Sequence, residues 1–88
     1  MKFTHYDLKQ CQQGQSVEVT LEGNAANVLL MDSINFQNYK NGRKHQHFGG
    51  HMTTSISKLP IPRTGHWHVV IDLGGFPGSV RSSVRVIQ

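Results

Sequence analysis

The sequence has a single cysteine among its 88 residues, so an intramolecular disulfide is excluded. One free thiol, Cys11, fits a reducing compartment better than secretion. The chain has no apolar run near the roughly 20 residues that a membrane-spanning helix needs, and its first residues lack the apolar run of a signal peptide. We therefore expect a cytoplasmic protein that does not enter a membrane.

Helical periodicity is also missing. Apolar residues do not recur at i, i+3, i+4 and i+7 over three turns, and glycines separate short apolar or alternating segments. This pattern predicts an all-β fold, with residues 1–88 as a single domain. We expect a β-sandwich or small barrel, jelly-roll-like, of about six to eight mostly antiparallel strands.

Acidic side chains are absent between Ser33 and Ile71. That stretch contains lysines, arginines and five of the six histidines, and the net charge of the whole chain is +4 with neutral histidines. We expect a positive potential there, which rises below about pH 6.5 as histidines protonate. This is either a solvated face that keeps a small protein soluble or a surface that binds anions.

The most apolar part of the chain, residues 65–87, has the pattern of two strands joined by a glycine-rich turn. Because side chains alternate along a strand, its only tryptophan lies on one face, and His66, His68 and Asp72 lie on the other. We predict that the two strands pair as a hairpin. The tryptophan face is buried, and the two imidazoles are exposed beside a cationic surface without carboxylates. The expected core is Val17, Val19, Leu21, Val28, Leu30, Trp67, Val69, Ile71 and Leu73.

Alternation and short apolar runs predict four further strands. They are residues 2–7, 16–22, 27–32 and 52–58. Asn41-Gly42 favours a type I′ turn, so residues 33–50 are expected to form a loose hairpin at a sheet edge. Pro60 and Pro62 cannot donate ladder hydrogen bonds, which makes their segment an edge strand or a connection.

A basic segment at residues 40–50 combines cations, carboxamides, glycines and aromatic rings. Proteins hold nucleotides and single-stranded nucleic acid with this mixture of charge and stacking surface, although an ordinary solvated turn has the same composition. Arg63, Arg81 and Arg85 extend the surface if they face the same way. The candidate ligand-binding residues are Lys40, Arg43, Lys44, His45, His47, His51, His66 and His68.

Two His-x-His pairs each place two imidazoles on one face of a strand. Three histidines suffice for a zinc site with an open position, and Asp72 is an outer carboxylate on the face of the second pair. Histidines that face solvent are the alternative. The candidate zinc ligands are His45, His47, His66 and His68.

Catalytic motifs are missing: the chain has no Gly-x-Ser-x-Gly elbow and no glycine-rich loop that opens a helix. Our first hypothesis is therefore a non-catalytic binding module without a cofactor. Its partner is an anionic ligand, a signalling protein or a second copy of the chain. The alternative hypothesis is a zinc-binding hydrolase that uses the His-x-His pairs.

Five segments of the chain carry a resemblance to a known family. They are MKFTHYDL at 1–8, GNAANV at 23–28, NFQNYKNG at 35–42, GHWHVVIDLGG at 65–75 and SVRSSVRV at 79–86. Together they resemble the bacterial DUF1883 family of domains of unknown function, over nearly the whole chain. The resemblance implies an all-β fold in small stand-alone bacterial proteins, joined in some chains to signalling domains of the Toll/interleukin-receptor type. It implies no catalytic residue, because the family has no established activity.

Overall fold

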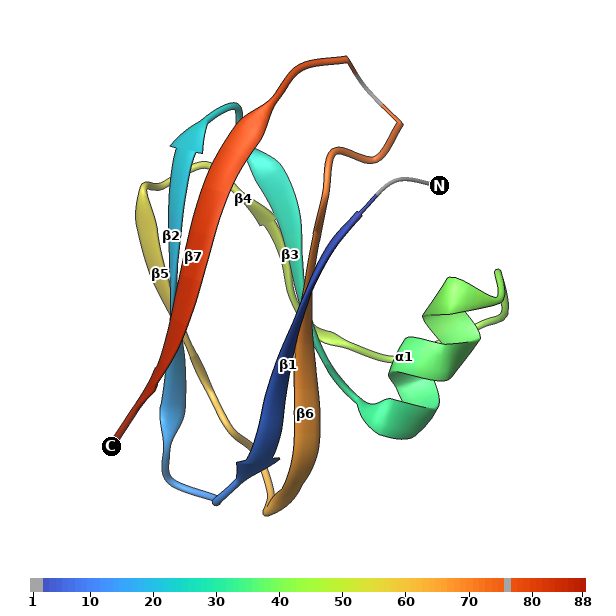
Figure 1. The fold of residues 1–88 in the computed structure, drawn as a ribbon, viewed down its shortest axis with the longest axis vertical. Helices are drawn as coiled ribbons and strands as arrows, with labels where there is room; N and C mark the ends of the chain where they lie inside the picture. Colours follow the sequence, from blue (N-terminus) through green and yellow to red (C-terminus); the bar gives the residue numbers. More distant parts are fainter. Residues whose placement is uncertain (1–2, 76) are drawn as a thin grey trace.

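The computed structural model describes residues 3–75 and 77–88, which form a sandwich of two antiparallel sheets (Figure 1). The elements are β1 (Thr4–Cys11), β2 (Ser16–Gly23), β3 (Ala26–Asp32), α1 (Ser33–Lys40), β4 (Phe48–Met52), β5 (Ile56–Pro60), β6 (Gly65–Asp72) and β7 (Val80–Ile87). One sheet has the order β1-β6-β3-β4 and the other β5-β2-β7. The all-β prediction is confirmed in its sandwich form, since the sheets do not close into a barrel. Within the described residues, no helix is long and apolar enough to span a bilayer.

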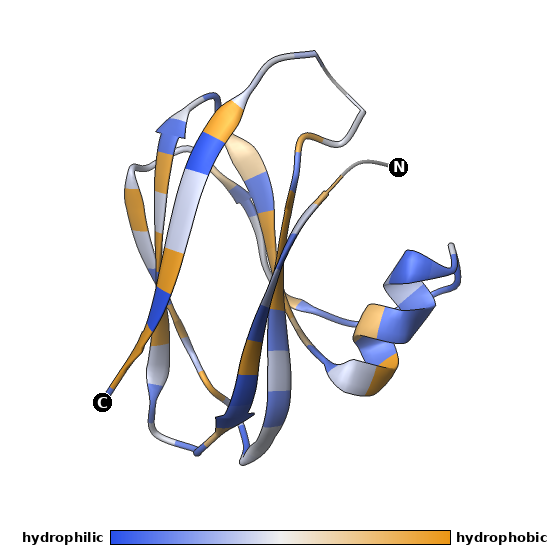
Figure 2. Ribbon diagram, in the orientation of Figure 1, coloured by the Kyte–Doolittle hydropathy of each residue, from blue (hydrophilic) through white to orange (hydrophobic). Residues whose placement is uncertain are grey.

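The core lies between the two sheets and is built from alternate residues of the central strands (Figure 2). Trp67 is 1% exposed, and the valines of β2 that face it across the core are equally buried. Every residue of the predicted core is buried except Leu73, which is half-buried and packs against the others. The predicted burial of the tryptophan face is therefore confirmed.

Both faces of β6 are covered, because α1 packs on the outer face of its sheet (Figure 1). Val70 of β6 joins Phe36 and Tyr39 of α1 in a second apolar cluster, and His68 is only 6% exposed. The prediction that both imidazoles face solvent is therefore wrong for His68 and right for His66 alone. Their surroundings also contain a carboxylate, because Asp7 on β1 contacts His66.

Residues 33–50 do not form the predicted hairpin. Asp32 caps α1 by accepting a hydrogen bond from the Asn35 N–H, and Asn41 ends the helix by donating to the Gln37 carbonyl. Gly42 follows with a φ of +72°, the left-handed conformation that commonly terminates helices. The Asn-Gly pair therefore ends a helix and does not turn a hairpin. At eight residues, α1 is too short to be stable alone and depends on packing its buried aromatic rings.

The predicted C-terminal hairpin is also wrong, because its two strands belong to different sheets. β6 lies between β1 and β3, whereas β7 pairs with β2 in a register that sets Arg85 opposite Glu18. Their connection crosses the sandwich, and Phe76 within it lies outside the described residues. Each strand presents an apolar face to the same core, so alternation alone fits both arrangements.

Two smaller differences affect the site. β1 was predicted at residues 2–7, of which residue 2 lies outside the described residues, but it continues to Cys11 through a bulge after Asp7. Lys9 at that bulge has a φ of +61°. The predicted strand 52–58 is divided into β4 and β5, and β5 is an edge strand that ends at Pro60, as the proline predicts.

Candidate functional site

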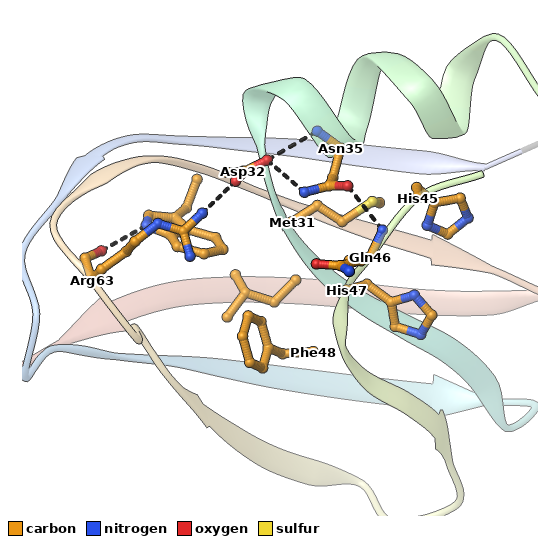
Figure 3. Close-up of a pocket in the computed structure, with 10 residues that line it drawn as sticks. Met31, Asp32, Asn35, His45, Gln46, His47, Phe48 and Arg63 are labelled. Atoms are coloured by element: carbon orange, nitrogen blue, oxygen red, sulfur yellow. Dashed lines mark hydrogen bonds and ion pairs between the residues drawn. The ribbon is translucent and has the colours of Figure 1, made fainter. Parts of the chain in front are cut away.

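A pocket of about 450 Å³ lies where β3 ends and α1 begins (Figure 3). The loop between α1 and β4 forms one wall, and the segment that leads into β6 forms another. Its polar lining is Asp32, Asn35, His45, Gln46, His47 and Arg63. Its apolar lining is Leu30, Met31, Phe48 and Trp67. The pocket therefore combines hydrogen-bond donors and acceptors with aromatic and aliphatic surface.

Hydrogen bonds at the helix start fix the first wall of the pocket. Asp32 Oδ1 accepts from the Asn35 backbone N–H at 2.9 Å and from the Asn35 side-chain amide at 3.0 Å. Asn35 Oδ1 in turn accepts from the Gln46 N–H at 2.8 Å. The loop is thus attached to the first turn of α1, and this attachment positions the two histidines on either side of Gln46.

Arg63 forms the opposite wall and is held at three points. Its guanidinium makes an ion pair with Asp32 and lies 5.0 Å from the centroid of the Trp67 ring. Its backbone carbonyl accepts a 2.9 Å hydrogen bond from Trp67 Nε1. The cation is therefore fixed over an aromatic face at the mouth of the pocket, where its side chain is still 58% exposed.

The two loop imidazoles lie next to each other in the pocket. The ring centroids of His45 and His47 are 5.4 Å apart, and His45 meets the Tyr39 ring edge-on at 5.2 Å. His45 Nδ1 is buried and has no hydrogen-bond partner among the described residues. A buried polar atom without a partner is energetically costly.

The other predicted ligand-binding residues are spread over the surface. Lys40 ends α1 with its ammonium 5.5 Å from the centroid of the Phe36 ring, and Arg43 and Lys44 are exposed in the loop that leads to the pocket. His51 is exposed on β4. Arg81 and Arg85 lie on the outer face of the other sheet, because they alternate with valines that pack against the core. Of the three arginines considered as extensions, only Arg63 reaches the pocket.

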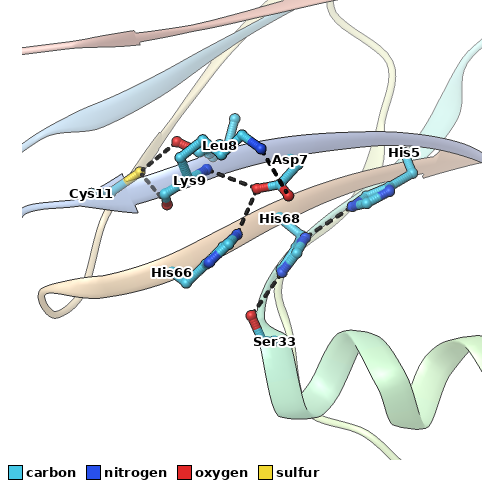
Figure 4. Close-up of polar contacts among 8 residues, drawn as sticks. All are labelled: His5, Asp7, Leu8, Lys9, Cys11, Ser33, His66 and His68. Carbon is cyan, nitrogen blue, oxygen red and sulfur yellow. Dashed lines mark hydrogen bonds and ion pairs between the residues drawn. The ribbon is translucent and has the colours of Figure 1, made fainter.

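His66 and His68 lie in a separate polar group on the outer face of β1 and β6, with His5 and Asp7 (Figure 4). Asp7 Oδ1 is 2.6 Å from His66 Nε2 and accepts from the Lys9 N–H at 2.9 Å. These hydrogen bonds, the one from Lys9 first, lower the pKa of the Asp7 carboxyl to about 2. Asp7 is therefore ionised at neutral pH.

His68 has a partner on each ring nitrogen. Its Nδ1 is 2.9 Å from His5 Nε2, and its Nε2 is 2.8 Å from Ser33 Oγ at the start of α1. Its ring stacks on His66, with centroids 4.8 Å apart, and on Phe36, with centroids 4.7 Å apart. Burial lowers the pKa of His68 and of His5, so both imidazoles are neutral at pH 7.

The structure brings together three potential metal ligands in this group. Each of Asp7, His66 and His68 offers one ligand atom, and these three atoms lie within 4.8 Å of one another. His45 and His47 stay in the pocket, so the described residues do not gather the two His-x-His pairs into one site. Asp72, the predicted outer carboxylate, is buried and accepts hydrogen bonds from the Tyr39 hydroxyl at 2.6 Å and from the Asn27 amide at 2.9 Å.

Sequence reasoning missed Asp32 and Asn35 in the pocket and Asp7 beside His66. Asp32 and Asn35 were predicted as parts of a strand and a hairpin, yet the Asp-Ser-Ile-Asn sequence at 32–35 has a preferred helix N-cap residue in its first position. Asp7 is 59 residues from His66, and only the pairing of β1 with β6 brings them together.

Comparison with known proteins shows the family to which the chain belongs. A family profile described as "Domain of unknown function (DUF1883)" matches residues 1–88, the whole chain. Neither the curated proteins nor the solved structures yield a match.

Proposed function

Because the chain belongs to the DUF1883 family, whose members are domains of unknown function, we propose from its own geometry that it is a non-catalytic binding module for a small anionic ligand. The ligand occupies the pocket between α1 and the segment before β6. One observation carries the proposal: a fixed guanidinium and two imidazoles surround an aromatic floor in a pocket of about 450 Å³. Pockets for small molecules typically measure about 300–1,000 Å³.

Charge supports an anion as the ligand. Arg63 has five N–H donors, and its contacts with Asp32 and Trp67 leave donors for a ligand. Arg43 and Lys44 lie on the adjoining loop without an acidic residue near them in the sequence. These exposed cations raise the local potential and attract anions toward the pocket.

The lining also favours a ligand with a flat ring. Phe48 is 49% exposed and meets Trp67 in an edge-to-face contact with ring centroids 6.2 Å apart. An exposed aromatic face stacks on a planar base. The Asn35 and Gln46 side chains are hydrogen-bonding groups that can read the edge of such a ring. A nucleotide combines the ring with the negative charge, so we choose adenosine monophosphate as the probe.

The test compares adenosine monophosphate with adenosine by calorimetric titration of untagged protein. We expect the phosphate-bearing probe to bind more tightly and to weaken as salt is raised from about 50 to about 200 mM, because salt screens exposed charges. Arg63→Gln is expected to weaken its binding at least about tenfold, in line with the loss of one charge-assisted hydrogen bond. Arg81→Gln is the control, since it removes the same charge from the far sheet.

Two double variants test whether the loop cations act because they lie beside the pocket or only because they add to the total positive charge. Arg43→Gln with Lys44→Gln removes two cations beside the pocket, and Lys58→Gln with Arg81→Gln removes two from the other sheet. Only the first pair is expected to reduce the salt dependence. Equal binding of adenosine and its monophosphate, or equal effects of both pairs, contradicts the proposal.

The free, buried thiol of Cys11 supports the cytoplasmic location expected from the sequence. The alternative, a zinc-binding hydrolase, has less support, because His45 and His47 lie in the pocket and apart from His66 and His68 on β6.

A further inference from the structure

We propose a second binding site, independent of the pocket, in which Asp7, His66 and His68 hold a divalent transition-metal ion on the outer face of β1 and β6. Ligand atoms of these three residues already lie within 4.8 Å of one another (Figure 4). No catalytic role is assigned to the ion. The site adds metal binding to a module whose pocket would take an organic anion.

Strand geometry explains why these three side chains meet. His66 and His68 are two residues apart on β6, so both project from the same face. Asp7 stands directly opposite His68 in the β1–β6 ladder, and directly opposed residues of antiparallel strands also share a face. The bulge after Asp7 turns the Lys9 N–H onto Asp7 Oδ1 at 2.9 Å and fixes that carboxylate beside the imidazoles.

The chemistry of the donors selects the kind of ion. Imidazole nitrogen suits Zn²⁺ and the neighbouring first-row metals, whereas Mg²⁺ requires mostly oxygen donors. Two imidazoles and one carboxylate leave room for water in a four-coordinate site. Bonds of about 2.0–2.1 Å in a tetrahedral site place the ligand atoms about 3.3 Å apart. That spacing lies between the 2.6 Å that separates Asp7 Oδ1 from His66 Nε2 and the 4.8 Å limit of the group.

His68 is held by hydrogen bonds and ring stacking, as histidine ligands in metal sites commonly are. His68 is hydrogen bonded at both nitrogens, so one nitrogen can bind the ion while the other keeps His5 or Ser33 as its partner. Such outer hydrogen bonds orient the ring and raise its affinity for metal. Because His68 is buried and held by stacking, it is the fixed ligand of the three.

The other two ligands give the ion access from solvent. The His66 side chain is 45% exposed and that of Asp7 is 33% exposed. Lys9 Nζ lies 3.7 Å from Asp7 Oδ2 on a largely exposed side chain, and it can swing away as the ion approaches. Binding then replaces the hydrogen bond between Asp7 and His66 with a bond from each residue to the ion.

The test uses untagged full-length protein that has been treated with chelator and then dialysed. Calorimetric titration with ZnCl₂ is expected to show one equivalent bound, and titration with MgCl₂ none. His66→Ala keeps the fold, since the residue is exposed, and is expected to weaken zinc binding at least about 100-fold, more than the loss of an outer partner. Asp7→Asn is expected to weaken it at least about tenfold.

Two controls and a second readout make the result specific. His51→Ala removes another exposed histidine from the same sheet and should leave zinc binding unchanged. The double variant His45→Ala with His47→Ala should keep zinc while losing the nucleotide, which separates this site from the pocket. Imidazole nitrogen resonances should shift for His66 and His68, and those of His45, His47 and His51 should stay in place. Absence of one-to-one zinc binding overturns the proposal, as does equal loss in His66→Ala and His51→Ala.

Discussion

Replacing Phe36 by alanine tests whether α1 is held by its buried ring. Phe36 is 5% exposed and stacks on His5 and His68, with ring centroids 4.1 and 4.7 Å away. It also meets the Phe3 ring edge-on at 6.2 Å. An eight-residue helix is too short to persist without such packing.

The magnitude follows from burial. Truncation of a buried phenylalanine typically costs about 3–5 kcal/mol, and we expect about 3 kcal/mol here because the cluster under α1 is small. With a urea dependence near 1 kcal/mol per molar for a small protein, the unfolding midpoint falls by about 3 M. Urea unfolding followed by Trp67 fluorescence and by far-ultraviolet circular dichroism measures this change.

The matched control is on the same helix. Ile34 is 75% exposed, so Ile34→Ala is expected to change the free energy of unfolding by less than about 0.5 kcal/mol. If Phe36→Ala costs less than about 1 kcal/mol, or no more than Ile34→Ala, then α1 does not dock on β6 as described.

Three further substitutions or modifications have definite outcomes. Tyr39→Phe removes the 2.6 Å hydrogen bond to the buried Asp72 carboxylate and is expected to cost about 2 kcal/mol in urea unfolding; a loss under about 0.5 kcal/mol refutes that contact. Gly49 and Gly14 both have a φ of +98°, but only at Gly49 would a Cβ collide with a backbone oxygen of β3, so Gly49→Ala should destabilise by at least about 1 kcal/mol more than Gly14→Ala. Equal losses show that the close approach is absent. Burial raises the pKa of the Cys11 thiol, so labelling by iodoacetamide at pH 8 should be slow in native protein and fast in urea, and rapid native labelling is inconsistent with a buried thiol.

Much of the sandwich was predictable because alternation records burial directly. In β2 the three apolar side chains Val17, Val19 and Leu21 alternate with polar ones, and all three are in the core. In β3 the run from Val28 to Met31 is continuously apolar, and both of its faces are covered. These patterns depend only on which faces of a strand are buried, and the spacing of apolar residues in the sequence predicts that directly.

Strand partners and the short helix were not predictable in the same way. The apolar faces of β6 and β7 fit a hairpin and a two-sheet sandwich equally well, and contacts with β1, β2 and β3 decide between them. Two turns of α1 offer only Phe36 and Tyr39 as buried positions, too few for a helical period to emerge. Asn41-Gly42 then favoured the wrong turn, because the same conformations end helices and close hairpins.

For the candidate sites, too, the residue types were predictable and the contacts between distant residues were not. His45, His47, His66 and His68 could be selected by residue type and spacing, but not sorted into two places. That sorting depends on the docking of α1 and on the register of β1 against β6, which brings Asp7 to His66. Contacts between residues this far apart in the chain come from tertiary structure and leave no local signal.

The most direct test of the proposed binding function is a nuclear magnetic resonance titration of the labelled protein with adenosine monophosphate. The chain has one tryptophan, so a single indole N–H resonance reports on Trp67 at the floor of the pocket. We predict that this resonance and the backbone N–H signals of Asn35 and Gln46 shift saturably, while those of β7 stay in place. Shifts that are absent, or that spread evenly over the exposed cations of both sheets, contradict a ligand seated in the pocket.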